Sequence, residues 1–72
     1  MIVTDGYLEG NFEGFKDFDT IFEFDNGAKW QQDEYKYLYH YAYRPRAKVI
    51  EDKGIYILEV QGINERIRVR RI

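Results

Sequence analysis

The fold of this chain is decided by residues 20–32, which read TIFEFDNGAKWQQ. Two phenylalanines separated by a single residue precede the turn, so both rings would lie on one face of a strand. Asn26-Gly27 is the strongest short hairpin signal, because a type I′ turn needs positive φ at both of its central residues. The stretch therefore predicts an antiparallel hairpin, with one strand over residues 20–24 and the returning strand over residues 28–32.

Turn signals recur about every 8–12 residues on both sides of this hairpin, which is the spacing of a small β-sandwich or barrel. Residues 7–12 alternate loosely, and Gly10 and Gly14 indicate a bulge or bend. Beyond Pro45, three more strands are predicted. They cover residues 46–52, with Ala47 and Val49 on one face; residues 55–60, nearly all apolar and therefore central in the sheet; and residues 65–72, with Ile67 and Val69 inward.

Residues 35–43 read YKYLYHYAY and place a tyrosine at every second position. A spacing of two is the period of a strand, and tyrosine has a high β propensity. A helix is the alternative, because it would gather Tyr35, Leu38, Tyr39, Ala42 and Tyr43 on one face. We favour the strand, which explains all five tyrosines by one rule and ends at Pro45, since proline cannot donate to a sheet ladder.

These elements predict an all-β fold in a single domain, residues 1–72: a five- or six-stranded antiparallel SH3-like barrel. The chain has no cysteine, so disulfides and thiolate metal sites are excluded and stability must come from burial of its aromatic residues, 18% of the total. The N-terminus lacks the features of a signal peptide, and no apolar stretch approaches the roughly 20 residues of a membrane span. The expected location is the cytoplasm.

The stretch TIFEFDNGAKWQQ also resembles a signature of small bacterial domains of unknown function: an apolar strand, an Asp-Asn-Gly turn and a Trp-Gln-Gln strand. Pro45, Val49-Ile50, Val60-Gln61-Gly62 and Val69-Arg70-Arg71 are similar to the rest of that pattern, which spans residues 10–71. The resemblance implies a small SH3-like β-barrel. It implies no catalytic residue, and the tyrosine row is denser here than that pattern leads us to expect.

The first candidate site is the tyrosine row with its aromatic and basic neighbours. Five large rings on one strand exceed what a domain of this size can bury, so we expect the row to be divided between core and surface. The candidate binding residues are Trp30, Tyr35, Tyr37, Tyr39, Tyr41, Tyr43, Arg44 and Arg46.

The second candidate is a stripe of arginines at the C-terminal end: Arg66, Arg68, Arg70 and Arg71. Alternate arginines on a strand would point outward and could meet phosphates or acidic partners. The simpler reading is a solvated face paired with acids such as Glu59 and Glu51. Charge is divided along the chain, since residues 1–36 carry nine acids and three bases and residues 37–72 carry four acids and eight bases. We expect most of these opposite charges to pair across neighbouring strands.

The sequence contains no set of residues that indicates an enzyme. His40 is the only histidine and has no recognisable catalytic partner, and the acids Asp17, Asp19, Glu23 and Asp25 do not match a calcium loop. No cofactor or metal is expected. Two functions remain: a protein-interaction module that contacts another protein or its own copy through the tyrosine row, and single-stranded nucleic-acid binding through the same rings and the arginine stripe. The net charge of −2 disfavours the second.

Overall fold

A computed structural model describes residues 1–72 and contains eight β-strands, all paired antiparallel. The structure has no helix that could cross a membrane. The strands are β1 (Ile2–Tyr7), β2 (Asn11–Phe15), β3 (Ile21–Glu23), β4 (Lys29–Gln32), β5 (Leu38–Tyr43), β6 (Arg46–Asp52), β7 (Ile55–Val60) and β8 (Arg66–Arg71). The all-β prediction is confirmed.

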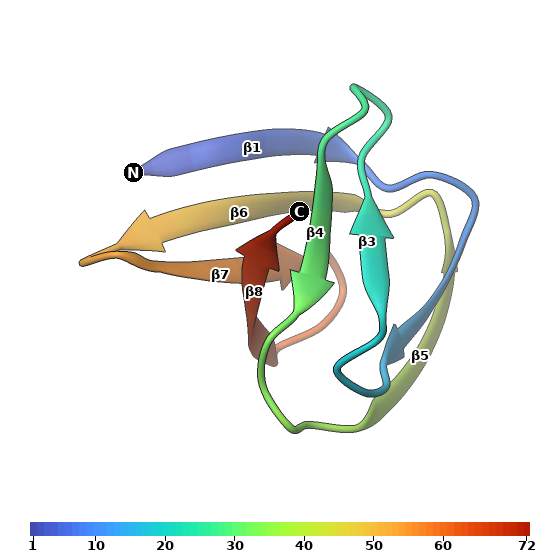
Figure 1. Ribbon diagram of the computed structural model, residues 1–72. Helices are drawn as coiled ribbons and strands as arrows, with labels where there is room; N and C mark the ends of the chain where they lie inside the picture. The colour runs from blue at the N-terminus through green and yellow to red at the C-terminus, as the bar shows by residue number, and fades with distance from the viewer.

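Six strands form one sheet in the order β1-β6-β7-β8-β4-β3, and the other two, β2 and β5, form a separate ribbon. In Figure 1 the strands β1, β6 and β7 run across the direction of β8, β4 and β3, so the main sheet is strongly curled. The ribbon of β2 and β5 lies to one side of it. The prediction that residues 55–60 are central is confirmed, because β7 lies between β6 and β8.

Two long, bent segments run side by side through both sheets. β1 leads into β2 across a bend at residues 8–10, and β5 leads into β6 across a bend at residues 44–45. Because β1 pairs with β6 and β2 pairs with β5, the two segments form one ribbon that leaves the main sheet halfway along. At the bend the backbone N–H of Arg44 donates to the carbonyl of Gly10 at 2.9 Å, and both residues have positive φ, 48° and 64°.

The expected five or six strands are too few, because the first long segment forms two strands where the sequence showed only a loose alternation over residues 7–12. Each long segment is divided into two strands, and residues 2–7, for which the sequence predicted no strand, form β1. The edge strands β1 and β3 approach each other at one end of the main sheet, where Leu8 and Phe24 form an isolated bridge. The backbone N–H of Glu9 donates to the carbonyl of Glu23 at 2.8 Å beside it.

The hydrophobic core lies between the ribbon and the main sheet. Phe12 and Phe15 of β2 pack on Phe22 of β3, with ring centroids 6.3 and 6.0 Å from it. The same cluster includes Ala47 and Val49, which share a face of β6 as predicted. It also includes Ile67 and Val69 of β8, whose predicted inward position is confirmed.

The hairpin between β3 and β4 is confirmed, but its turn is not of type I′. Gly27 has positive φ, 92°, and Asn26 does not. The N–H of Gly27 donates to the carbonyl of Phe24 at 3.0 Å, and the N–H of Phe24 donates to the carbonyl of Ala28 at 2.8 Å, which closes a three-residue loop. The side chain of Asn26 accepts a hydrogen bond from the N–H of Ala28 at 2.9 Å instead. Asparagine stabilises this turn by that bond and not by its tolerance of positive φ.

Candidate surface site: the tyrosine row

The tyrosine row is a strand along most of its length, as predicted. β5 begins at Leu38, and Tyr39, Tyr41 and Tyr43 point away from the protein. The other residues of β5, among them Leu38 and Ala42, are half-buried on the opposite face and pack against the core. The alternation in sequence therefore decides which side of β5 is covered.

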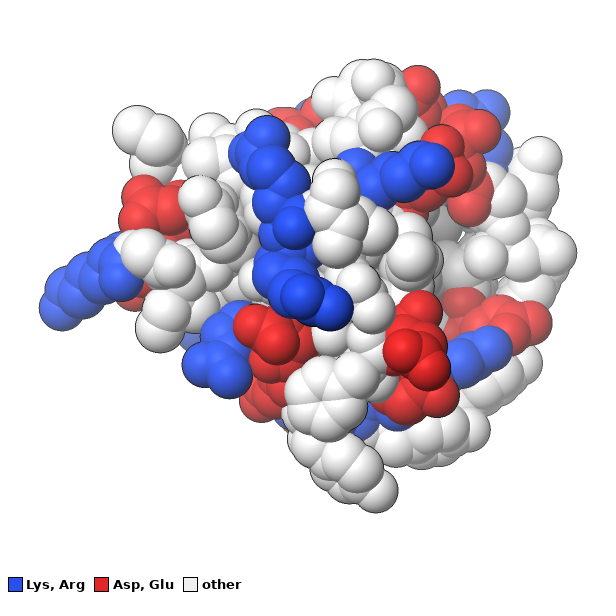
Figure 2. Space-filling view, in the orientation of Figure 1, with Lys and Arg blue, Asp and Glu red and all other residues white.

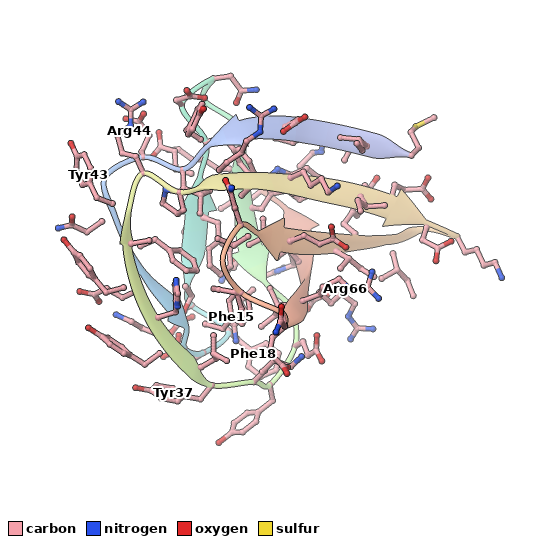
Figure 3. All side chains as sticks on the ribbon, turned by 180° about the vertical axis from the view of Figure 1, so that it is seen from behind. Phe15, Phe18, Tyr37, Tyr43, Arg44 and Arg66 are labelled. Carbon is pink, nitrogen blue, oxygen red and sulfur yellow. The ribbon has the colours of Figure 1, made fainter.

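All five tyrosines are exposed, by 55 to 86% of their surface. The expectation that some of them lie in the core is wrong. The ribbon has only one face on the core, and the large buried rings are those of phenylalanine and Trp30, none of which carries a hydroxyl that would need a partner. In Figure 3, Tyr43 of β5 and Tyr37 of the segment before it extend outward, while Phe15 lies inside.

Tyr35 and Tyr37 lie outside the strand, in the connection between β4 and β5. This connection is fixed by Gln32, a fully buried side chain that the sequence analysis did not single out. Its Nε2 donates to the carbonyls of Glu34 and Lys36 at 3.0 and 2.9 Å, and its Oε1 accepts from the N–H of Lys16 at 3.0 Å. A buried amide with three such bonds stabilises the loop in one position, so the row continues beyond the end of β5.

Two further residues touch the row. The ring of Phe18 lies 6.5 Å from that of Tyr35, and the hydroxyl of Tyr41 donates to Oδ1 of Asn11 at 3.1 Å. Phe18 is itself half exposed and extends the aromatic surface at the Tyr35 end. No periodicity in the sequence links Phe18 to residues 35–43, so its place beside the row could not be predicted.

The charges near the row are paired with one another. Lys16 forms an ion pair with Glu13, and the pKa of Lys16 is raised above its ordinary value by that hydrogen bond and charge, with a smaller contribution from Tyr37. Arg44, at the other end of the row, lies 3.8 Å from carboxylate oxygens of both Glu9 and Asp25. The aromatic surface is therefore bordered by neutralised charges.

Two of the predicted binding residues lie elsewhere. Trp30 is only 1% exposed, and its ring packs on Tyr56 inside the protein, with the guanidinium of Arg71 4.8 Å above it. Arg46 lies past the bend in β6, where its guanidinium is 5.6 Å from the ring of Tyr7 and 3.2 Å from Asp5. The hydrogen bond with Tyr7 and the charge of Asp5 raise the pKa of Arg46. Trp30 is thus a core residue, and Arg46 belongs to β1 and β6.

The arginine stripe points outward from β8, as predicted. Arg66 pairs with Glu59 at 3.1 Å and Arg68 lies 3.9 Å from Asp33. Figure 2 shows basic side chains gathered near β8 and β4 with acidic side chains beside them. Glu51 is not one of the partners, because its carboxylate accepts from the N–H of Gly54 at 2.7 Å.

The stripe and the tyrosine row do not share a surface. β8 lies in the main sheet between β7 and β4, whereas β5 pairs only with β2. In Figure 3, Tyr37 and Tyr43 are on one side of the molecule and Arg66 is on the other.

The unequal charges of the two halves of the sequence are paired with each other only in part. Four ion pairs join a base after residue 37 to an acid before it: Arg44–Glu9, Arg44–Asp25, Arg46–Asp5 and Arg68–Asp33. His40 is half-buried and lies against the turn at Gly62. No three acidic or histidine side chains come together where they could hold a metal ion.

Comparisons of the chain with protein-family models, with curated proteins and with solved structures found no match. The resemblance of residues 10–71 to small bacterial domains therefore stays an expectation.

Proposed function

We propose that this protein is a non-enzymatic interaction module whose contact surface is the tyrosine row, Tyr35 to Tyr43, with Arg44 at its end. The observation that carries the proposal is the exposure of all five rings. Tyrosine suits protein interfaces because it offers a large, rigid contact area with few rotatable bonds, together with a polar tip.

The area of the row supports this proposal. With 55 to 86% of each residue exposed and about 150–250 Å² in each ring, the five tyrosines present roughly 500–900 Å². The largest apolar patch of a typical monomer is about 300–600 Å², and a standard interface takes about 800 Å² from each partner. The row alone is thus of the size that one side of a protein interface requires.

The electrostatics favour a protein partner over a nucleic acid. A single-strand binder combines stacking rings with cations that follow the phosphates. Lys16 and Arg44, the cations beside the row, already have carboxylate partners, and the arginine stripe lies on another side of the molecule. The contacts in the structure therefore support nucleic-acid binding less than the sequence pattern does.

We also propose that the fold is of the SH3-like barrel class. The curled six-stranded sheet and the bridge between Leu8 and Phe24, which joins its two edge strands, support a barrel that is closed at one end. A cytoplasmic, bacterial setting is part of this proposal, and the absence of cysteine fits a reducing compartment.

Static light scattering over a wide range of protein concentration tests the row as a contact surface. We expect the average mass of the wild-type protein to rise with concentration and that of Tyr39→Ser to stay monomeric. Tyr7→Ser is the matched control, because Tyr7 is exposed but lies on β1, and it should behave like the wild type. A wild-type mass that stays monomeric at every concentration would contradict self-association through the row.

A further inference from the structure

β5 has one edge without a partner. The strand pairs only with β2, and no backbone hydrogen bond joins residues 38–43 to any other part of the chain. A free edge presents a row of unpaired N–H and C=O groups, which is a template for another strand. In the main sheet, by contrast, the edge strands β1 and β3 meet each other at the Leu8–Phe24 bridge.

The unpaired groups on this edge belong to the tyrosines. On the β2 side, a β-carbon placed on Gly14 would meet the carbonyl oxygen of Leu38 and the backbone nitrogen of His40, and the N–H of Arg44 donates to Gly10. The even-numbered residues of β5 therefore turn their backbone groups toward β2. Because these groups alternate in direction along an antiparallel strand, those of Tyr39, Tyr41 and Tyr43 face the free edge.

The side chains of this edge do not protect it against pairing. Natural edge strands carry lysine, proline or a bulge, or are covered by a loop. Residues 38–43 contain no lysine and no proline, but the register shift of the ribbon gives β5 one more residue than β2, with His40 and Tyr41 opposite Glu13. The free edge of β5 is thus a six-residue strand with one bulge and no lysine or proline, and it is open to a partner.

Building on the proposed function, we infer that the partner is a second copy of this chain, paired antiparallel along β5 with a two-fold axis at Tyr41. Tyr41 would face Tyr41 of the second copy, and Tyr39 would face Tyr43. Backbone hydrogen bonds form only between residues whose N–H and C=O groups point toward the other strand. On the free edge of β5 those residues are the tyrosines, so each tyrosine must face a tyrosine. This register pairs all three tyrosines of β5, and a shift by two residues leaves one unpaired.

The resulting dimer has a continuous four-stranded sheet with six tyrosines of the two β5 strands on one face. Aromatic pairs directly across two strands stabilise such a sheet. Identical surfaces meet at a two-fold axis, so an unbalanced charge would repel itself. The cations just beyond the ends of the strand avoid this repulsion, because Lys36 lies 3.3 Å from Glu65 and Arg46 lies 3.2 Å from Asp5.

Single cysteines test the register, because the natural chain has none. Cα atoms of a hydrogen-bonded antiparallel pair are about 5.5 Å apart, within the range of roughly 4.4–6.8 Å that a disulfide spans. The four variants Tyr41→Cys, Tyr39→Cys, Tyr43→Cys and Tyr35→Cys are oxidised with copper phenanthroline and analysed on non-reducing gels. All four replace exposed side chains, and circular dichroism checks that each variant folds.

Tyr41→Cys should form a disulfide-linked dimer at least several-fold faster than the other three variants alone. Tyr39→Cys and Tyr43→Cys should cross-link efficiently only when they are mixed with each other. Tyr35→Cys lies outside β5 and reports random collision. Equal rates for all four variants, or no gain on mixing, would overturn the inference.

The two proposals fail in different ways. If light scattering shows association that Tyr39→Ser abolishes, but the cysteines show no preference for Tyr41, the row is a contact surface and the edge pairing is wrong. If the wild-type protein is monomeric at every concentration, self-association itself is wrong, and the pairing with it.

Discussion

At Gly14 the backbone of β2 passes so close to β5 that a side chain has no room. A β-carbon there would overlap the carbonyl oxygen of Leu38 and lie 2.9 Å from the backbone nitrogen of His40, and the φ of 105° is strained for any other residue. This glycine permits the bulge at which the register of the ribbon shifts. The close packing of β5 on β2 therefore requires glycine at position 14, because any other residue has a β-carbon there.

Gly14→Ala should lower the free energy of unfolding by about 3 kcal/mol or more, because strain in φ and overlap with backbone atoms add together. Urea unfolding followed by fluorescence measures the change. Gly10→Ala is the matched control, since Gly10 also has positive φ, 64°, but has open space around it. The control should cost about 1 kcal/mol. Equal losses for the two variants would show that the close approach at Gly14 is unimportant.

Among the hairpins, the type I′ geometry occurs between β6 and β7 and not at Asn26-Gly27. Asp52 pairs with Ile55, so the loop has only two residues, and both have positive φ: 56° at Lys53 and 85° at Gly54. Lysine is unusual at the first of these positions, where asparagine is preferred. The sequence pointed to the wrong turn because an Asn-Gly pair also suits a three-residue loop.

Lys53→Asn should therefore raise the free energy of unfolding by about 0.5–1 kcal/mol, because asparagine tolerates the left-handed conformation better than lysine does. Thermal and urea unfolding of the variant measure the gain. Lys29→Asn provides the comparison, since Lys29 is an exposed lysine on β4 without positive φ, and it should give no gain. A loss of stability in Lys53→Asn would argue against the turn geometry.

Strands with a clear apolar pattern could be predicted from the sequence, and others could not. β6 and β7 have the predicted bounds, because each has apolar residues at positions that one side of a sheet must bury. β1 was missed because Asp5 and Gly6, two residue types depleted in strands, interrupt its sequence. The bends were predicted at Gly10 and Pro45, but nothing in the sequence indicates the positive φ of Arg44.

The candidate site could be predicted in part. The spacing of the tyrosines predicted that they share one face, and it holds for the residues within β5. Spacing did not reveal which face the core would cover, and for this reason the predicted division of the row was wrong. Trp30 was predicted to lie at the surface site but is buried, and the role of buried Gln32 was not predicted at all.

Across the whole molecule, aromatic residues are sorted by their hydroxyl groups. Phenylalanines and the tryptophan fill the core, and the five tyrosines of residues 35–43 lie in solvent. Two rings depart from this division: Phe18 is half exposed next to Tyr35, and Tyr56 packs on Trp30. The stability of the monomer and the proposed contact surface therefore rest on different sets of rings.

This separation predicts that contact and stability can be altered independently. Tyr39→Ser should change the free energy of unfolding by less than about 1 kcal/mol, since its ring is exposed. Phe15→Ala removes a fully buried ring and should cost about 3–5 kcal/mol. Urea unfolding at low concentration, where association is absent, compares the two. A large loss in Tyr39→Ser would show that the row also supports the fold.

The long bent ribbon has a consequence for the order in which the chain assembles. The hairpins β3–β4, β6–β7 and β7–β8 join neighbouring segments, but the ribbon joins the two ends of a much longer loop, with Ile2 paired to Ile50 and Asn11 to Tyr43. Closing a longer loop costs more chain entropy, and contacts distant in sequence slow folding. During synthesis β1 and β2 emerge first and must wait for their partners. The tyrosine strand therefore gains its ordered edge late, so the surface exists only when folding is nearly complete.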